Sequence, residues 1–247
     1  MTNVPRAPGN GCEPDVQLRQ ILFSQGFGSR RECDALIRAG RVQILGRITD
    51  EPQAEFTTQG LEFTVRGQTW PYHAKALLLL NKPAGCECSR QPRHHPSVLS
   101  LLPAPLRTRG VQPVGRLDAD TTGLLLLSDD GALIHRLTSP KWHVPKVYVA
   151  DCAEAVTPAQ IERLLHGVVL HDDPQPVRAA ACEAAGERRV RLTLTEGKYH
   201  QVKRMLAAVG NRVLALQRVR FGELELPADL PLGQWRWVER SAVARWL

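Results

Sequence analysis

The sequence predicts an α+β protein, with a small basic unit followed by a larger unit built on a mixed, largely antiparallel sheet. Beyond residue 76, apolar alternation and turn residues predict more strands than helices, without the regular crossover helices of a parallel sheet. Short elements of a different pattern come before it, and a polar, irregular stretch separates the two. The length of 247 residues suits one large domain or one medium domain plus a small one.

Four segments follow from these observations. Residues 1–14 are rich in Pro, Gly and Asn, so we expect a disordered tail. Residues 15–70 form the small unit, 71–75 the linker and 76–247 the larger unit.

The small unit is predicted to hold two short helices and then two short strands. Apolar spacing predicts a first helix that ends near Gly26. Residues 29–32 (Ser-Arg-Arg-Glu) form a capping box, so a second helix begins there, and Gly40 ends it. Val42–Leu45 and the residues from position 48 onward predict strands on either side of a turn at Gly46.

Arginines cluster on this small unit, at positions 30, 31, 38, 41 and 47. Two short helices followed by a basic Gly-Arg-Val turn resemble the alpha-L RNA-binding module shared with a small-subunit ribosomal protein. Ile44-Leu45-Gly46 departs from the Val-Asn-Gly that is usual there. The resemblance implies that the unit binds RNA; the alternative is a solvated basic helix face. The residues expected to contact RNA here are Arg30, Arg31, Arg38 and Arg41.

The charge balance also favours a polyanionic partner. Lys and Arg total 32 against 25 Asp and Glu, which gives a net charge of +7. No apolar run approaches the roughly 18 residues of a membrane span, and the N-terminus lacks the apolar core of a secretory signal. We therefore expect a cytoplasmic protein with no membrane partner.

Six scattered cysteines predict reduced thiols, because their spacing shows no disulfide framework. Cys86 and Cys88 lie near His94 and His95, which would suit a metal site. However, Cys-x-Cys is tighter than the usual ligand spacing, and no second pair follows. We predict no metal.

The larger unit begins with a buried strand at Ala76–Leu80 and a turn at 81–85 (Asn-Lys-Pro-Ala-Gly). Gln91–Arg109 is rich in Pro, Arg and His and is predicted to be an exposed loop. The later elements follow from alternation, helical spacing and caps. They are a helix at 133–137, a strand at 146–149, a helix from Thr157 to Gly167, a strand at 190–194 and a helix at 202–209.

The stretch that carries the chemistry runs from Gly115 to Gly123 (Gly-Arg-Leu-Asp-Ala-Asp-Thr-Thr-Gly), with an apolar strand and Ser-Asp-Asp-Gly after it. Such a strand is a rigid base that holds the loop in one pose. The stretch resembles the catalytic loop of the pseudouridine synthases, and Asn-Lys-Pro-x-Gly resembles the entry strand of their catalytic domain. The resemblance implies that Asp118 is the nucleophile. By itself, Asp118 would be read as a turn-forming residue.

Two further candidates match other motifs of that family. Tyr148 lies in Lys-Val-Tyr, where its ring would hold the uracil and its hydroxyl could transfer a proton. Lys203 lies in Lys-Tyr-His-Gln-Val-Lys-Arg-Met, where the family has a cation paired with the catalytic Asp. Lys198 and Arg204 are the rival choices for that pair.

The amino-acid sequences of these motifs are most similar to those of the branch that acts on small-subunit ribosomal RNA. The resemblance therefore implies isomerisation of a specific uridine in 16S RNA, free or in a partly assembled small subunit, without a cofactor. The alternatives are the relatives that act on 23S RNA and a non-catalytic ribosome-assembly factor. Arg116, Lys82 and Arg204 complete the residues expected to contact RNA, and we expect a monomer.

Overall fold

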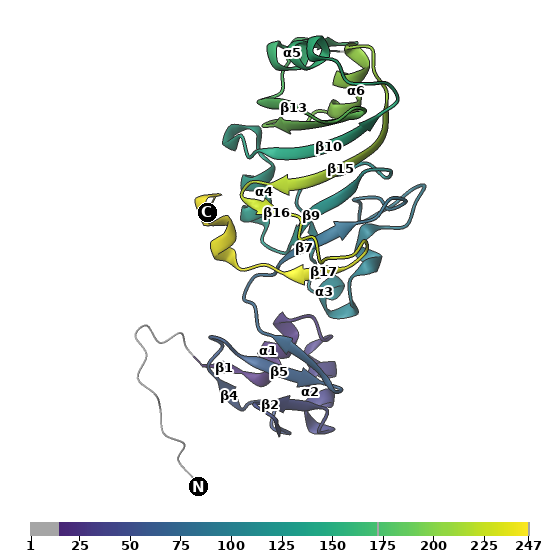
Figure 1. Cartoon of the computed structure of the whole chain (residues 1–247). Coiled ribbons are helices and arrows are strands. Elements are labelled where there is room, and N and C mark those ends of the chain that lie inside the picture. The colour runs from purple at the N-terminus through teal and green to yellow at the C-terminus, as the bar shows by residue number, and fades with distance from the viewer. Residues whose placement is uncertain (1–14, 172, 247) are drawn as a thin grey trace. The chain divides into compact units, whose positions relative to one another are not determined.

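The computed structural model describes residues 15–171 and 173–246 (Figure 1). The predicted tail, 1–14, lies outside the described residues. The chain divides into two compact units. The first comprises the chain up to Ala74 together with Ala104–Gly110, and the second comprises Lys75–Pro103 and Val111–Leu247.

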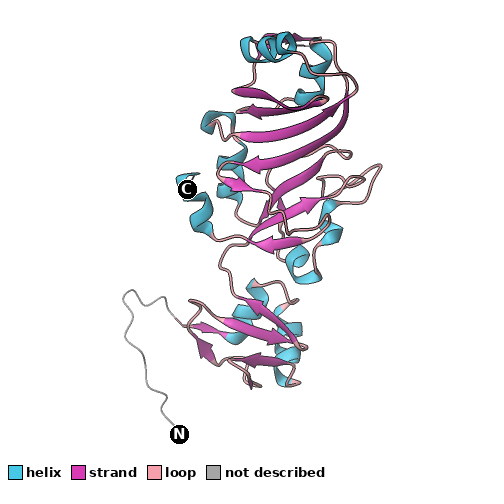
Figure 2. Ribbon diagram, viewed as in Figure 1, coloured by secondary structure: helices cyan, strands magenta, loops and turns pink. Residues whose placement is uncertain are grey.

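The first unit packs two helices with short antiparallel strands (Figures 1 and 2). The helices are α1 (Leu18–Ser24) and α2 (Arg30–Arg38). One sheet pairs β1 (Val16–Gln17) with β4 (Glu55–Phe56). The other has the order β3-β2-β5-β6, formed by Arg47–Ile48, Val42–Ile44, Glu62–Val65 and Gln68–Pro71 respectively. Strand β6 therefore continues to Pro71, the first residue of the predicted linker.

The predicted capping box at the start of α2 is confirmed. The Ser29 hydroxyl accepts from the Glu32 N–H at 3.3 Å, and the Glu32 carboxylate accepts from the Ser29 N–H at 2.7 Å. The same exchange between Thr157 and Gln160 begins α5 (Pro158–His166). Both helices thus begin where the sequence places them.

The predicted loop 91–109 is partly wrong, because it contains a 3₁₀ helix, η1 (Val98–Leu101), and a short helix, α3 (Ala104–Thr108). Leu106 of α3 is buried in the first unit. Arg109 secures this return of the chain, because its guanidinium donates to the Gln25 side chain at 2.7 Å and to the His73 carbonyl at 2.9 Å. An apolar residue between Pro and Arg gives no local sign of that long-range contact.

The second unit is built on one nine-stranded sheet, which curves and twists in Figure 2. Its main path is β13-β14-β10-β15-β9-β7-β17, with β16 beside β15 and β8 beside β9. Only β15 and β9 pair in parallel among the described strands, which agrees with the mixed, largely antiparallel sheet expected. In that path order the strands are Ala181–Gly186, Arg189–Leu194, Lys146–Cys152, Val213–Phe221, Thr122–Ser128, Leu77–Lys82 and Trp235–Trp237, with β16 at Leu224–Glu225 and β8 at Gln112–Pro113.

The central strands β7 and β9 are apolar on both faces because both faces are covered. Leu77, Leu79, Leu124 and Leu126 share one core cluster with residues of helix α4 (Gly131–Thr138). Helices α5 and α6 (Gln201–Ala208) lie at the β13 end of the sheet (Figure 1). The remaining elements are η2 (Pro140–Trp142), β11 (Val168–Leu170), β12 (Asp173–Val177) and η3 (Arg240–Trp246).

No helix among residues 15–171 and 173–246 has both the length and the apolar character needed to cross a membrane.

Candidate active site

The loop between β8 and β9 carries Asp118, and a buried lysine holds it from inside the second unit. Lys82 is 0% exposed. Its Nζ donates to the carbonyl oxygens of Pro83, Asp118, Ala119 and Thr121 at 3.0, 3.1, 3.2 and 2.9 Å. A buried ammonium needs such bonds to offset its lost hydration, and three N–H groups here share four acceptors. Lys82 therefore fixes the backbone on which Asp118 stands.

This placement corrects the expectation that Lys82 contacts RNA. Strand β7 continues through Lys82, which pairs with Gly123 of β9, so the side chain lies under the loop and away from solvent. Burial lowers the pKa of Lys82 below its usual value. A sequence motif shows that a lysine follows a strand, but it does not show which side of the turn the lysine enters.

A thiol supports the same loop from a neighbouring segment. The Cys88 sulfur accepts a hydrogen bond from the Leu117 N–H at 3.4 Å, directly before Asp118. Burial raises the pKa of Cys88, which suits a structural thiol. Within the described ranges, no three His, Cys, Asp or Glu side chains gather in a way that could hold a metal ion.

The exit of the loop depends on a glycine at a close strand crossing. Gly123 has φ +100°, and a Cβ there would lie 2.3 Å from the Arg218 carbonyl oxygen of β15. The Arg218 side chain also links the two strands, because its Nε donates to the Leu124 carbonyl of β9 at 2.8 Å. Only glycine permits this approach of the two parallel strands.

The Asp118 carboxylate lies between two basic side chains from the start of α6. Lys203 Nζ is 3.4 Å from Oδ2, and His200 Nε2 is 3.4 Å from Oδ1. The Asp118 side chain is 29% exposed, so it is held by these neighbours and remains open to a ligand. His200 takes a left-handed conformation (φ 47°) as the residue before α6, which turns its ring toward the loop.

Lys203 is shared between two carboxylates of the loop. Its Nζ donates to Asp120 at 2.6 and 2.8 Å, closer than to Asp118. The hydrogen bond from Lys203 lowers the pKa of Asp120. Of the three basic residues considered for the pair, Lys203 lies 3.4 Å from Asp118, and Arg204 donates to the Tyr199 carbonyl at 3.0 Å. Lys198 lines the cavity described next.

Asp118 opens into a cavity of about 430 Å³. That volume lies within the range of about 300–1,000 Å³ that is usual for small-molecule sites. Its walls come from the loop that carries Asp118, the start of α6 and strands β10 and β15. Side chains that line it include Arg116, Asp118, Lys146, Tyr148, His200, Arg218 and Phe221.

Strands β10 and β15 supply one wall of this cavity. Tyr148 of β10 lies directly opposite Arg218 of β15, and Lys146 lies opposite Phe221. Lys146 and Tyr148 are two residues apart on one strand and therefore point to the same face. We call Lys146, Tyr148, Arg218 and Phe221 the cavity wall.

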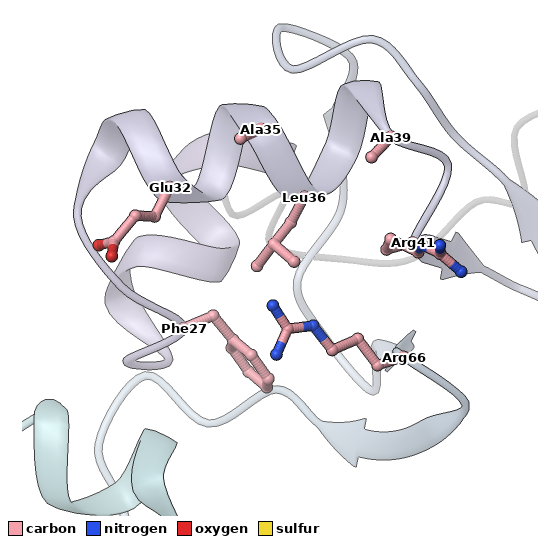
Figure 3. Close-up of a pocket in the computed structure, with 7 residues that line it drawn as sticks. All are labelled: Phe27, Glu32, Ala35, Leu36, Ala39, Arg41 and Arg66. Atoms are coloured by element: carbon pink, nitrogen blue, oxygen red, sulfur yellow. The ribbon is translucent and has the colours of Figure 1, made fainter.

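A larger hollow of about 740 Å³ lies in the first unit (Figure 3). Phe27, Leu36, Arg41 and Arg66 line it. The carboxylate there, that of Glu32, is held by the cap at Ser29, so this hollow lacks a free acid or nucleophile. It suits contact with a ligand better than chemistry.

Of the other basic residues expected to contact RNA, Arg204 is half-buried and the remaining five lie at exposed positions. Arg30, Arg31, Arg38 and Arg41 are exposed on α2 and just after it, and Arg116 is exposed at the cavity. The Arg30 guanidinium lies 5.0 Å from the centre of the Phe23 ring, whose side chain is also exposed.

Sequence reasoning missed several residues of the site. No role beyond shaping the loop was predicted for Asp120, although it is the closer partner of Lys203. No role was predicted for His200, Lys146, Arg218 or Phe221. His200 stood inside the quoted Lys-Tyr-His-Gln motif and Lys146 inside Lys-Val-Tyr, so both signals were present; Arg218 and Phe221 had no motif to mark them.

Comparisons with known proteins agree with this geometry. The family model "RNA pseudouridylate synthase" matches residues 76–208. The ribosomal small subunit pseudouridine synthase A of Escherichia coli (strain K12) is 42% identical, over 93% of this chain and 99% of its own. The Haemophilus influenzae protein of the same name is 35% identical over 93% and 99%.

A solved structure described as a pseudouridylate synthase superposes with a TM-score of 0.67 at 32% identity. The match covers 94% of this chain and 100% of that one. The family model spans more than half of the chain, and the relatives match it almost end to end. The chain therefore belongs to the RNA pseudouridylate synthase family.

Proposed function

We propose that this chain isomerises a specific uridine in small-subunit 16S ribosomal RNA, with Asp118 as the nucleophile. The observation that carries the proposal is the position of the Asp118 carboxylate. Its loop is held from below by the buried Lys82, and the carboxylate is flanked by Lys203 and His200 and open to a cavity. The choice of RNA is supported by relatives named for the small ribosomal subunit, one of them 42% identical.

The reaction conserves every atom of the uridine. Asp118 attacks C1′ of the ribose, and the C1′–N1 bond breaks with its electron pair passing to N1. The free base turns until C5 faces C1′. The C5–C1′ bond then forms as the ester to Asp118 breaks, a proton leaves C5 and N1 gains one. The net change is an isomerisation, so it calls for no oxidant, reductant or cofactor.

Tyr148 and Lys203 serve this sequence in different ways. The Tyr148 ring lines the cavity beside the base, where it excludes water, and its hydroxyl takes part in moving the C5 proton. The positive charge of Lys203, 3.4 Å from Asp118, attracts the carboxylate and fixes its rotamer.

The first unit and the rim of the cavity bind the RNA. We assign residues 15–70 to the alpha-L module, with Arg30, Arg31, Arg38 and Arg41 facing phosphates. Arg116 and Arg204 act near the target nucleotide. The base must leave its stack to reach Asp118, which costs a few kcal/mol, and contacts to the distorted backbone offset that cost.

The substrate is either free 16S RNA or a partly assembled small subunit in the cytoplasm, and the protein acts as a monomer. A reaction on purified RNA and on assembling particles separates the two substrates. Sedimentation during the same incubation tests the monomer.

The experiment is primer extension on 16S and 23S RNA after carbodiimide treatment, because pseudouridine has the same mass as uridine but retains the carbodiimide adduct. We expect one new stop, in 16S RNA, that is absent with Asp118→Asn. The matched control is Asp120→Asn, which removes a charge from the same loop and should keep the stop. A stop only in 23S RNA would overturn the substrate, and no stop on any RNA or particle would favour the assembly-factor alternative.

A further inference from the structure

The cavity wall holds two cations for which the proposed steps so far give no use. Lys146 and Arg218 both line the cavity, and both lie against the same aromatic ring. Lys146 Nζ is 5.7 Å from the centre of the Phe221 ring, and the Arg218 guanidinium carbon is 5.1 Å from it. Phe221 thus holds two positive groups close together in one wall.

Neither cation has a protein carboxylate as a partner in the described chain. Arg218 is 2% exposed, and its Nη2 has no hydrogen-bond acceptor there. Burial, and then the charge of Arg218, lower the pKa of Lys146 to about 8. The two carboxylates that line the cavity have other partners. Asp118 lies between Lys203 and His200, and Glu196 accepts from Gln201 at 2.7 Å.

A buried cation beside a half-buried one, without a counter-ion, costs free energy unless a ligand supplies acceptors. Their place in the fold identifies where that ligand lies. Arg218 is the cross-strand neighbour of Tyr148, and Lys146 is two residues from it on the same face. The acceptors must therefore arrive beside the Tyr148 ring, where the base lies in the proposed function.

We propose that Lys146 and Arg218 hold the uracil as an anion during the interval in which it is detached from the ribose. This inference rests on the proposed role of Asp118. When the C1′–N1 bond breaks, the electron pair remains on the base, and its charge spreads over N1 and the carbonyl oxygens O2 and O4. N–H donors of the two cations stabilise that charge. When C5 bonds to C1′ and loses its proton, and N1 gains one, the base becomes neutral again.

This arrangement divides the work between two sides of the cavity. The Asp118 side acts on the sugar carbon, and the cavity wall acts on the leaving base. Fixed donors that face developing charge in a site with little water are worth about 10²–10³ in rate for each donor. A cation that acts only while the base is an anion should change the rate of reaction and leave RNA binding nearly unchanged.

The first test measures single-turnover pseudouridine formation and RNA affinity for Lys146→Met. We expect the rate constant to fall about 10²-fold or more, with the dissociation constant for RNA within about threefold. Lys146→Arg, which restores the charge, should recover most of the rate. Lys75→Met removes an exposed lysine of the same unit and is the matched control. If Lys146→Met lost about 10²-fold in RNA affinity and kept its rate constant, the lysine would be a phosphate contact and the proposal would be overturned. If neither the rate constant nor the affinity changed, the proposal would also be overturned.

The second test needs no RNA and compares two small probes in competition binding. Uracil is neutral at pH 7, whereas barbiturate is a similar ring that carries a negative charge. We expect the wild type to bind barbiturate at least about tenfold more tightly than uracil, and Lys146→Met to lose that preference. Equal binding of the two probes by the wild type would contradict the proposal.

The two tests separate this inference from the proposed function. A wild type that makes pseudouridine, with a fully active Lys146→Met variant, leaves the function standing and removes this inference. A wild type that makes none on any ribosomal RNA removes the proposed function, and the barbiturate preference then decides alone whether the cation pair binds a pyrimidine anion.

Discussion

Two lysines of the second unit, the buried Lys82 and the half-buried Lys146, show how the same residue type can serve structure or chemistry. Lys82 lies under the catalytic loop, with four carbonyl oxygens within 3.2 Å. Lys146 lies in the cavity wall, with an aromatic ring and another cation beside it. The difference between them is the supply of acceptors. A buried cation whose acceptors are built into the backbone fixes the fold, and one without acceptors is available to a ligand.

The same contrast separates the two sides of the cavity. The loop is held by Lys82 and by Cys88, so Asp118 has little freedom. The wall contains unused donors, among them Nη2 of Arg218. We infer that the loop is ready before RNA arrives and that the wall is completed by the base.

The largest expected effect comes from Asp118, the loop side chain that we propose attacks the substrate. Asp118→Asn should lower product formation by about 10⁴-fold or more, because the nucleophile is lost. Lys82 and Cys88 hold the loop through its backbone carbonyl and N–H groups and not through the Asp118 carboxylate, so the melting temperature and RNA affinity should change little. Calorimetry and RNA binding measured beside the single-turnover rate check this. A variant that loses activity by unfolding would break the contrast between platform and nucleophile.

The pH dependence of stability and of activity tests the role of Lys146 in the cavity wall. Folding lowers the pKa of Lys146 from 10.5 to about 8, so between those values the unfolded chain binds more protons than the folded one. The free energy of unfolding should therefore rise with pH from about 8 to 10.5, relative to Lys146→Met. Over the same range kcat/KM should fall about tenfold for each pH unit, because Lys146 loses the proton that gives it the positive charge facing the detached uracil. Stability and activity that fall together would contradict this.

The basic surface of the first unit should affect binding alone. Replacing Arg30, Arg31 and Arg38 by Gln should lower RNA affinity and reduce the salt slope by up to about 2, at about 0.7 for each contact to single-stranded RNA. The rate at saturating RNA should stay the same, because these residues lie outside the catalytic unit. Filter binding at several salt concentrations checks the slope. An unchanged slope would show that this surface does not meet phosphates.

The smallest effect is expected at Asp120. Its side chain is 72% exposed, so its bond to Lys203 should contribute about 0–1 kcal/mol. Asp120→Asn frees Lys203 to move toward Asp118, and the rate should change by no more than a few-fold. A loss comparable to that of Asp118→Asn would make Asp120 a second essential carboxylate and would erase the distinction between them.

Local signals predicted the parts of the fold that are local. The capping box at Ser29 and the apolar strand after Gly123 needed only neighbouring residues, and the structure has both. Motif resemblance brought Asp118 and Lys203 together although they lie far apart in sequence, and the two are 3.4 Å apart.

The error at Lys82, the missed helix at Leu106 and the missed role of Arg218 involve long-range pairing. The burial of Lys82 follows from the register of β7 on β9, and the burial of Leu106 follows from its place in the first unit. The meeting of Arg218 with Tyr148 follows from a bulged register between β10 and β15. A sequence pattern fixes which face a residue takes on its own strand, but not the strand that lies opposite.

The most direct test of the account compares the free energy of unfolding of Lys82→Met and Lys146→Met at pH 7 without RNA. Removing Lys82 takes the Nζ donor from the Pro83 and Thr121 carbonyl groups, whereas the Asp118 and Ala119 carbonyls still accept from the Thr121 and Gly85 N–H groups. At about 1–3 kcal/mol for each carbonyl left without its donor, we predict a loss of about 2 kcal/mol or more. Removing Lys146 relieves a half-buried charge that has no carboxylate partner, so that variant should be as stable as the parent or more stable. If Lys146→Met is destabilised as much as Lys82→Met, Lys146 is part of the scaffold and the central distinction fails.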